Sequence, residues 1–261
     1  MGSMVGRSVL DFLRHNVGFA MRHDYPTTLK FWQKAYVGSQ ARVIREWGRT
    51  GFANLRDYEF KGAQGKGRST WAEDVPPTGR SLIVGSGTSR LGLDMFEAGW
   101  QSVTHMDFAP AVIEDREEQP GLEWVLGDAR DLGAVFDNKT ELFDSLIDKG
   151  TVDSIYLSGS QKHLEDIENI VDGAARIAKR GGRFFIFSLT QPIYLRRILH
   201  TVKTSHYWEW DKLQVRQLEF VYMYILTRRH NLYKLSGDET TKQLKGSRKK
   251  KHKFNRLRGG R

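Results

Sequence analysis

The stretch "SLIVGSGTSRLG", residues 81–92, runs from a short apolar segment into a glycine-rich turn that opens a helix. Glycines between a strand and a helix let backbone N–H groups approach a ligand closely. Gly85 and Gly87 form G-x-G, but four residues separate Gly87 from Gly92, where a dinucleotide turn has two. The Lys-Ser/Thr pair of a triphosphate loop is absent as well. The turn therefore disfavours both a dinucleotide and a nucleoside triphosphate.

Alternating strand and helix patterns follow this turn toward the C-terminus. The predicted strands are 81–85, 102–107, 122–128, 143–150 and 183–189, and the predicted helices are 89–99, 110–119 and 163–180, the last ending at Gly181 and Gly182. A short helix at 191–199 and two long strands at 207–218 and 219–229, placed to pair antiparallel, complete the pattern. The sequence thus predicts an α/β fold whose sheet is mostly parallel, with an antiparallel C-terminal edge and helices on both faces.

The region before the glycine turn is less regular. Residues 27–60 carry apolar residues at helical spacing and predict two helices, whereas 61–80 is a Gly/Pro/charge-rich linker without periodicity. We expect three segments along the chain: an N-terminal extension at 1–24, a central domain at 25–230 and a basic tail at 231–261.

Composition excludes several classes of protein. The chain has no cysteine, which rules out a disulfide framework, a thiolate metal site and a cysteine nucleophile. No apolar run reaches the roughly 18 residues of a transmembrane helix. We expect neither a metal site nor a transmembrane segment.

The formal charge of +10 is concentrated at the C-terminal end. From Arg228 onward 13 Lys and Arg residues face only Asp238 and Glu239, so the body of the chain is close to neutral. The tail lacks the apolar residues needed to bury itself. It is either a solvated tail or a contact to RNA or a ribonucleoprotein through residues 245–261.

Residues 1–24 place arginines among apolar residues, loosely as in a mitochondrial transit peptide, although Asp11 weakens that pattern. An ordinary amphipathic helix fits equally well. The predicted location is the mitochondrion, with the cytoplasm as the alternative.

Three carboxylates stand at the ends of successive predicted strands. Asp107 follows Gly85 by 22 positions, where a carboxylate can accept both ribose hydroxyls of an adenosine. Asp128 can meet the adenine edge, and Asp148 is expected to face the same crevice. Each aspartate alone can equally be a helix cap or a loop residue. Together they suit a ligand with ribose hydroxyls, an amino group and a positive sulfonium, which S-adenosylmethionine has, and they would repel phosphates.

Four motifs carry a resemblance to a known family: "LIVGSGTSRL", "THMDFAPAVI", "LGDARDL" and, most specifically, "FDSLIDKGTVDSI". With them the chain resembles the seven-strand S-adenosylmethionine-dependent methyltransferases over about residues 25–230. Within that family it is similar to the protein-lysine methyltransferases that modify elongation factor 1-alpha or mitochondrial citrate synthase. The resemblance implies a Rossmann-like class I methyltransferase sheet and S-adenosylmethionine as cofactor.

The resemblance also implies roles for particular residues. The glycine turn would hold the methionine moiety through Gly85, Ser86, Gly87 and Thr88. Asp107 would hold the ribose with Phe108 beside it, and Asp128 and Ala129 would hold the adenine. Asp148 would be the catalytic residue at the methyl-transfer mouth, and Trp47, Lys149 and Thr151 would lie on the substrate side.

One departure from the family pattern concerns the substrate side. The family carries an acidic-Trp-aromatic element there, and this chain has Glu46 and Trp47 followed by Gly48. The first hypothesis is a protein-lysine methyltransferase with a protein partner. The alternatives are a methyltransferase-fold structural or assembly subunit of a large mitochondrial ribonucleoprotein or membrane complex, and, third, an RNA methyltransferase, although "DKGT" stands where base-amine enzymes have Asn/Asp-Pro-Pro-aromatic.

Overall fold

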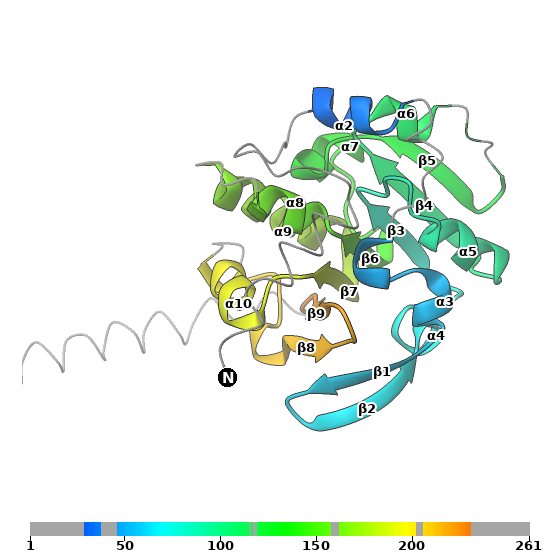
Figure 1. Ribbon diagram of the computed structural model, residues 1–261. Helices are drawn as coiled ribbons and strands as arrows, with labels where there is room; N and C mark the ends of the chain where they lie inside the picture. Colours follow the sequence, from blue (N-terminus) through cyan, green and yellow to red (C-terminus); the bar gives the residue numbers. More distant parts are fainter. Residues whose placement is uncertain are drawn as a thin grey trace, which may run out of the picture.

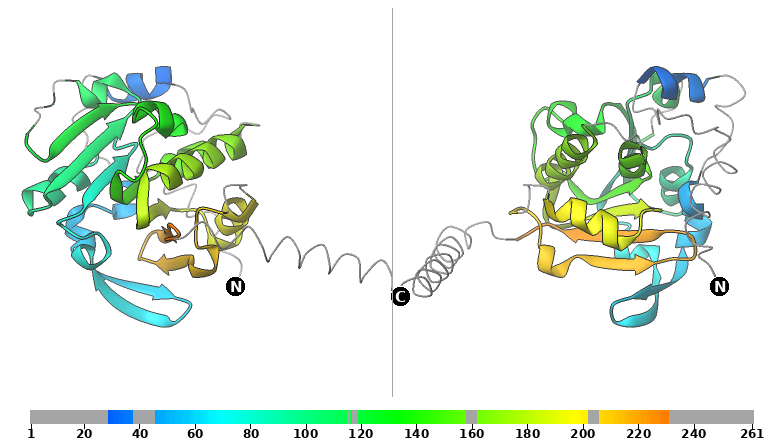
Figure 2. Two further views of the ribbon diagram at one scale, coloured as in Figure 1. Left: turned by 180° about the vertical axis from the view of Figure 1, so that it is seen from behind. Right: turned by 60° about the vertical axis from the view of Figure 1, so that its left-hand side comes forward.

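A computed structural model describes residues 29–37, 46–114, 116, 119–157, 162–201 and 206–230. Its centre is a nine-stranded sheet in the order β2-β1-β8-β9-β7-β6-β3-β4-β5. Helices lie on both faces of this sheet, and the β1–β2 hairpin projects from one end (Figures 1 and 2). The α/β class expected from the sequence is confirmed.

Five parallel strands form the part of the sheet that carries the glycine turn. They are β3 (Arg80–Val84), β4 (Ser102–Asp107), β5 (Leu122–Leu126), β6 (Phe143–Lys149) and β7 (Ala178–Ser188). Val84 lies beside Met106 on one side and beside Asp148 on the other. Since parallel strands all end at the same edge of the sheet, this register gathers the loops that follow them into one crevice.

The two C-terminal strands pair antiparallel as predicted, but they are shorter than predicted and the β1–β2 hairpin lies outside them, so they are not the edge of the sheet. β9 (Tyr222–Thr227) pairs with β7, and β8 (Gln214–Gln217) pairs with β9. The rest of the strand predicted at 207–218 includes the 3-10 helix η4 (Trp210–Lys212) and a single bridge from Trp208 to Arg228. The buried indole of Trp208 donates to the Val171 carbonyl, so this segment covers a helix and does not extend the sheet.

The helices divide between the two faces of the sheet. One face is covered by α7 (Leu132–Val135), α8 (Thr151–Leu157), α9 (His163–Ile177) and α10 (Pro192–Thr201), and the other by α3 (Phe52–Leu55), α4 (Trp71–Asp74) and α5 (Leu91–Glu97). A third, smaller cluster packs α2 (Leu29–Ala35) against α6 (Pro110–Ile113). The helix predicted at 110–119 is only one turn long in the structure, because the backbone of Glu114 is already extended.

The end of α9 differs from the prediction. The helix stops at Ile177, and Ala178 already has extended backbone at the start of β7. Gly181 and Gly182 lie inside this strand, where Gly181 has φ +77° and its N–H donates to the Arg228 carbonyl. The glycines accommodate an irregularity in the β6–β7 register and do not end the helix.

The segment predicted to be an unstructured linker is largely ordered. β1 (Asp57–Gly62) and β2 (Gly65–Thr70) form an antiparallel hairpin, and α4 follows directly. Thr70 and Glu73 make a reciprocal capping box at the start of α4. Among the described residues of 27–60, the helical elements are α2, the 3-10 helix η2 (Trp47–Arg49) and α3, and β1 begins at Asp57.

The N-terminal extension at 1–24 and the basic tail at 231–261 lie outside the described residues, so both remain predictions. In the described part of the chain, no helix combines the length and apolar character needed to cross a membrane. The same part contains no group of three or more His, Asp or Glu side chains arranged to hold a metal ion.

His105 on β4 is a polar side chain enclosed by the fold. It is 1% exposed and stacks on Trp124 with ring centroids 4.1 Å apart. Neither ring nitrogen has a hydrogen-bond partner among the described residues. Burial, assisted by the charges of Arg116 and Lys149, lowers the pKa of His105 to about 3.

We therefore expect His105 to weaken the fold in acid. The unfolded chain takes up a proton near pH 6.5 and the folded chain only near pH 3, so stability is complete above pH 6.5 and falls as the pH drops. This one group would contribute a slope of up to about 1.4 kcal/mol per pH unit. Urea unfolding between pH 7 and 4 should show a shallower decline for His105→Leu. His206→Leu is the exposed control, and an unchanged slope in His105→Leu would contradict the prediction.

Candidate functional site

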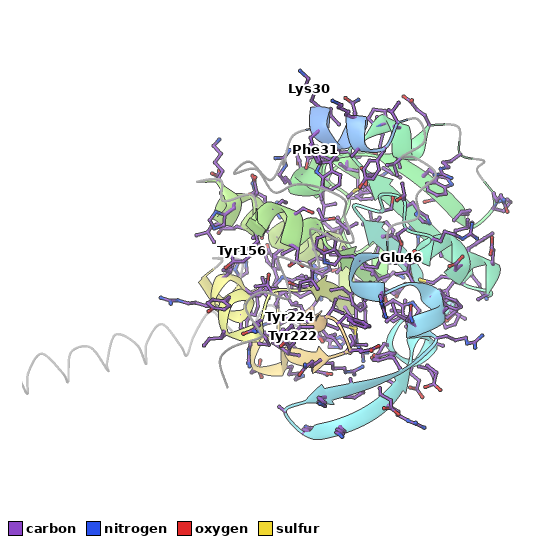
Figure 3. The ribbon with its side chains drawn as sticks, in the orientation of Figure 1. Lys30, Phe31, Glu46, Tyr156, Tyr222 and Tyr224 are labelled. Atoms are coloured by element: carbon purple, nitrogen blue, oxygen red, sulfur yellow. The ribbon has the colours of Figure 1, made fainter. Side chains whose placement is uncertain are left out.

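A cavity of about 310 Å³ lies at the carboxyl ends of β3, β4, β5 and β6. Eleven of the predicted site residues line it: Trp47, Gly85, Ser86, Gly87, Thr88, Asp107, Phe108, Asp128, Ala129, Lys149 and Thr151. α2 and the 46–50 turn close its remaining side, and Figure 3 marks Glu46 on that turn next to the sheet. The structure thus brings the predicted residues to one place, except for Asp148.

The glycine turn forms the floor of the cavity. Gly85 and Gly87 have φ of +62° and +52°, a conformation that favours glycine. A Cβ on Gly85 would lie 2.0 Å from Thr151 Oγ1, and the Thr151 hydroxyl donates to the Val84 carbonyl. Ser86 Oγ is buried without a hydrogen-bond partner among the described residues. The turn therefore offers both close backbone approach and a buried hydroxyl.

Asp107 is held rigidly at the end of β4. Its two carboxylate oxygens accept from Gly87 N at 2.8 Å and from Ala109 N at 2.9 Å. Each oxygen keeps further acceptor capacity, and the residue is 4% exposed. Burial raises the pKa of Asp107 to about 6 even though these backbone donors lower it. The arrangement suits a neutral ligand with two hydroxyl donors.

Asp128 has a partner that the sequence reasoning missed. Its carboxylate accepts from the backbone N of Arg130 at 2.9 Å and pairs with the Arg130 guanidinium at 2.6 Å. These contacts lower the pKa of Asp128 against the opposing effect of its partial burial. Arg130 also lines the cavity and reaches Asp166 at 3.6 Å. The guanidinium thereby joins the loop after β5 to α9.

The expectation that Asp148 faces the crevice is wrong. Its side chain is fully buried and is not among those that line the cavity in the described chain. Its carboxylate accepts from Gly150 N and Val152 N, both at 3.2 Å, and so supports the start of α8. Burial, together with the charge of Asp153, raises the pKa of Asp148 to about 8. The position is that of a helix cap.

The side chain of Glu46 lies against the N-terminal end of α5, beside the glycine turn. Its carboxylate accepts from Arg90 N at 2.8 Å and from Ser89 Oγ at 2.9 Å. A helix N-terminus after a glycine turn is where a pyrophosphate would bind. Here a carboxylate of the chain itself takes those donors, which agrees with the exclusion of dinucleotides drawn from the glycine spacing.

Lys149 is the counterion of Glu46 and is buried with it. The Lys149 ammonium pairs with the Glu46 carboxylate and also donates to Thr50 O at 3.0 Å and Ser89 Oγ at 2.8 Å. The lysine side chain is 3% exposed, and burial lowers the pKa of Lys149 while Glu46 raises it. All three ammonium hydrogens therefore have acceptors inside the protein.

Trp47 is fixed at the rim from two sides. Its indole N–H donates to Asp153 Oδ2 at 3.0 Å, and its ring packs on Gly150, where a Cβ would lie 2.5 Å from the indole. Asp153 also accepts from Leu189 N at 2.7 Å and from the Ser188 hydroxyl, so it ties the rim to the end of β7. The Asp of "DKGTVDS" that supports Trp47 is thus Asp153.

Sequence reasoning did not single out several cavity residues as site residues. They are Trp32 of α2, Tyr36 directly after α2, Ser89, Arg130 and Ile155, whereas Glu46 belongs with Trp47 to the acidic-Trp element already noted in the sequence. Trp32 and Tyr36 stand four positions apart on one helical face and stack with ring centroids 5.4 Å apart. That i,i+4 aromatic spacing was the available signal. Nothing in the sequence indicates that Arg130 turns back onto Asp128.

The residues present fit S-adenosylmethionine. Asp107 offers two buried acceptors for ribose hydroxyls, and Ser86 offers an unpartnered hydroxyl at the turn. The aromatic side chains of Trp32, Tyr36 and Phe108 give the cavity apolar walls suited to an adenine. The Asp107 carboxylate, which has no cation paired with it in the described chain, would repel a phosphate in the same place.

Comparisons with known proteins agree with this geometry. Residues 82–186 match the family described as "Methyltransferase domain". A mouse protein named EEF1A lysine methyltransferase 4 is 26% identical over 182 residues, which cover 65% of this chain and 69% of that protein. The eEF1A lysine and N-terminal methyltransferase of Xenopus laevis is 28% identical over 130 residues, which cover 48% of this chain but only 18% of that longer protein.

Among solved structures, one is a 1,6-didemethyltoxoflavin-N1-methyltransferase of Burkholderia thailandensis with bound 1,6-didemethyltoxoflavin and S-adenosylhomocysteine. It matches with a TM-score of 0.43 and 14% identity over 59% of this chain and 72% of that chain. Residues 82–186, which run from β3 into β7, form a methyltransferase domain. This domain is of the S-adenosylmethionine-dependent class.

The local geometry requires a glycine at position 48, where the resemblance led us to expect an aromatic residue. It has φ +57°, and a Cβ there would lie 1.8 Å from Val221 Cγ1. We expect Gly48→Ala to lower the free energy of unfolding by more than the roughly 1 kcal/mol of left-handed backbone strain alone. Gly65→Ala is the control, because Gly65 has φ +105° and no atom within 4 Å of the added Cβ. Equal losses in urea unfolding would show that the Val221 contact is unimportant.

Proposed function

We propose that this protein is a protein-lysine N-methyltransferase. The observation that carries the proposal is the arrangement of Asp107, the glycine turn and Trp47 around one cavity, at the strand ends of a methyltransferase domain. The names of the relatives, lysine methyltransferases of elongation factor 1-alpha, favour a lysine side chain as the acceptor.

S-adenosylmethionine, when bound, supplies a methyl group on a positively charged sulfur. Asp107 would accept the ribose hydroxyls, and the turn from Gly85 to Thr88 would hold the methionine moiety. Phe108 and Ala129 would contact the adenine. These residues hold and orient their ligand, so catalysis rests on positioning and exclusion of water, and no covalent intermediate on the chain is required.

The target amine must reach the cavity without its proton, which it binds with a pKa of about 10.4 in water. Trp47 and Lys149 border the route, and a poorly hydrated channel beside a positive charge lowers the pKa of an amine. Asp148 caps α8 from beneath, so it supports the loop and does not contact the amine.

The surroundings of the rim favour a protein substrate over RNA. A second cavity of about 350 Å³ adjoins the first and shares Gly48 and Arg49 with it. Three carboxylates, Asp57, Glu59 and Glu219, line it together with Arg49. Glu59 is paired with Arg68, but acidic side chains still outnumber basic ones among the described residues of this lining. Carboxylates next to the rim attract a basic peptide segment and repel a phosphate backbone.

The proposal is tested by binding and by methyl transfer. Calorimetric titration with S-adenosylhomocysteine should show micromolar-range binding, and tritiated S-adenosylmethionine with purified elongation factor 1-alpha should yield methyl-lysine by mass spectrometry. Binding without transfer to this substrate would retain the cofactor site and redirect the search to other proteins. Absence of binding would overturn the proposal and favour a structural role, and label found in RNA would replace lysine as the acceptor.

Asp107 gives a pH dependence to this binding. Its pKa of about 6 in the free protein means that the carboxylate is ionised at pH 7.5 and mostly protonated at pH 5. Since ribose hydroxyls need acceptors, affinity for S-adenosylhomocysteine should fall by about tenfold over that range. Asp107→Asn should bind weakly at both pH values, and the exposed control Asp211→Asn should follow the wild type. A pH-independent affinity in the wild type would contradict the assignment.

A further inference from the structure

Two parts of the cavity wall come from segments far apart in the sequence and need something to hold them together. The glycine turn and the start of α5 belong to the methyltransferase domain, whereas the 46–50 turn precedes it. The contact between them is polar and buried, and it is centred on one ammonium group, that of Lys149.

The three acceptors of Lys149 show what this ammonium joins. Glu46 and the Thr50 carbonyl are the two ends of the 46–50 turn, and Ser89 belongs to the loop that enters α5. Ser89 in turn donates to Glu46 and accepts from Leu91 N at 3.1 Å. Removing the ammonium would leave a partly buried carboxylate, a carbonyl and a hydroxyl without their shared donor.

The 46–50 turn has two internal backbone hydrogen bonds, from Arg49 N to Glu46 O at 3.2 Å and from Thr50 N to Trp47 O at 3.1 Å, and it also contains left-handed backbone. Gly48 and Arg49 both have left-handed backbone, with φ of +57° and +58°. Such consecutive left-handed residues persist only where the surroundings impose them. Trp47, which lies between Glu46 and these two residues, is presented to the rim by this turn.

We propose that Lys149 is a positioning residue: its ammonium clamps both ends of the 46–50 turn against the loop before α5, and so fixes the cofactor turn and Trp47 together. The inference rests on the proposed methyltransferase function. Lys149 itself stays a bonded cation, with no hydrogen left to give a substrate and 3% of its side chain exposed. It therefore acts through Glu46, Ser89 and Trp47.

The test compares cofactor affinity with stability in the full chain. Lys149→Met, Glu46→Gln and the double variant are titrated with S-adenosylhomocysteine and unfolded in urea without ligand. Lys149→Met should weaken binding by about tenfold or more, since it leaves the Glu46 carboxylate uncompensated. The double variant should bind no more than about twofold more weakly than Lys149→Met, because both changes break the same clamp.

Lys179→Met is the matched control. Lys179 pairs with Asp144 at 2.8 Å on the same sheet, but its side chain is 42% exposed and does not line the cavity. The affinity of the Lys179→Met variant for S-adenosylhomocysteine should stay within about twofold of that of the wild type. A general loss of stability would lower the unfolding midpoint without changing the affinity of the protein that remains folded.

Two outcomes overturn the inference. One is a Lys149→Met protein that binds within about twofold of the wild type. The other outcome applies if Lys149→Met does not fold. The test then uses Glu46→Gln, which keeps the shape of the side chain and removes its charge. An unchanged affinity of Glu46→Gln for S-adenosylhomocysteine would reject the clamp. Failure of the wild type itself to bind S-adenosylhomocysteine would instead refute the proposed function, so the two failures are distinguishable.

Discussion

The ion pair between the partly buried Glu46 and the buried Lys149 is the contact on which the proposed positioning of the site depends. It lies where a segment that precedes the methyltransferase domain meets the end of β6. A buried charge pair adds little net stability compared with apolar packing, but a single partner left alone is costly. Such a pair therefore contributes little to the free energy of unfolding, and its main effect is to determine which two surfaces pack together. Here it specifies that Trp47 faces the strand ends and that the start of α5 accepts no outside anion.

Most of the parallel core could be predicted because β3, β4, β6 and β7 are largely buried on both faces. The run "SLIV" is largely apolar, and "SVTHMD" combines Val, Thr and Met with a turn before it and an Asp at its end, so β3 and β4 follow from local sequence. The hairpin β1–β2 could not be predicted in this way, because its strands are exposed and rich in glycine and charge. Gly181 and Gly182 misled for a related reason: glycines tolerate a strand irregularity as well as a helix end, and only the pairing of β6 with β7 distinguishes the two.

The site shows the same division between local and long-range information. Residues on the glycine turn and at the ends of β4 and β5 could be placed because one rule, strand ends at one edge, positions them all. The backbone of Asp148 lies at the strand end as this rule predicts. Its side chain does not face the cavity and instead accepts a hydrogen bond from the start of α8. The role of Lys149 depends on Glu46, which lies 103 positions earlier in the chain. The spacing within "DKGTVDS" does not show that Lys149 pairs with Glu46, or that Asp153 and not Asp148 binds Trp47.

The hairpin β1–β2 also determines where the sheet can no longer grow. β2 forms one outer edge of the nine strands, with backbone groups on its far side that could pair with another chain. Its sequence, "GKGRST", places Lys66 and Arg68 there among glycines and leaves no apolar run. Lys66 is exposed at this edge and Arg68 pairs with Glu59 of β1, so a chain approaching the edge meets charged side chains and no apolar run. Strand β2, whose sequence is typical of a linker, thus disfavours edge-to-edge pairing of two sheets.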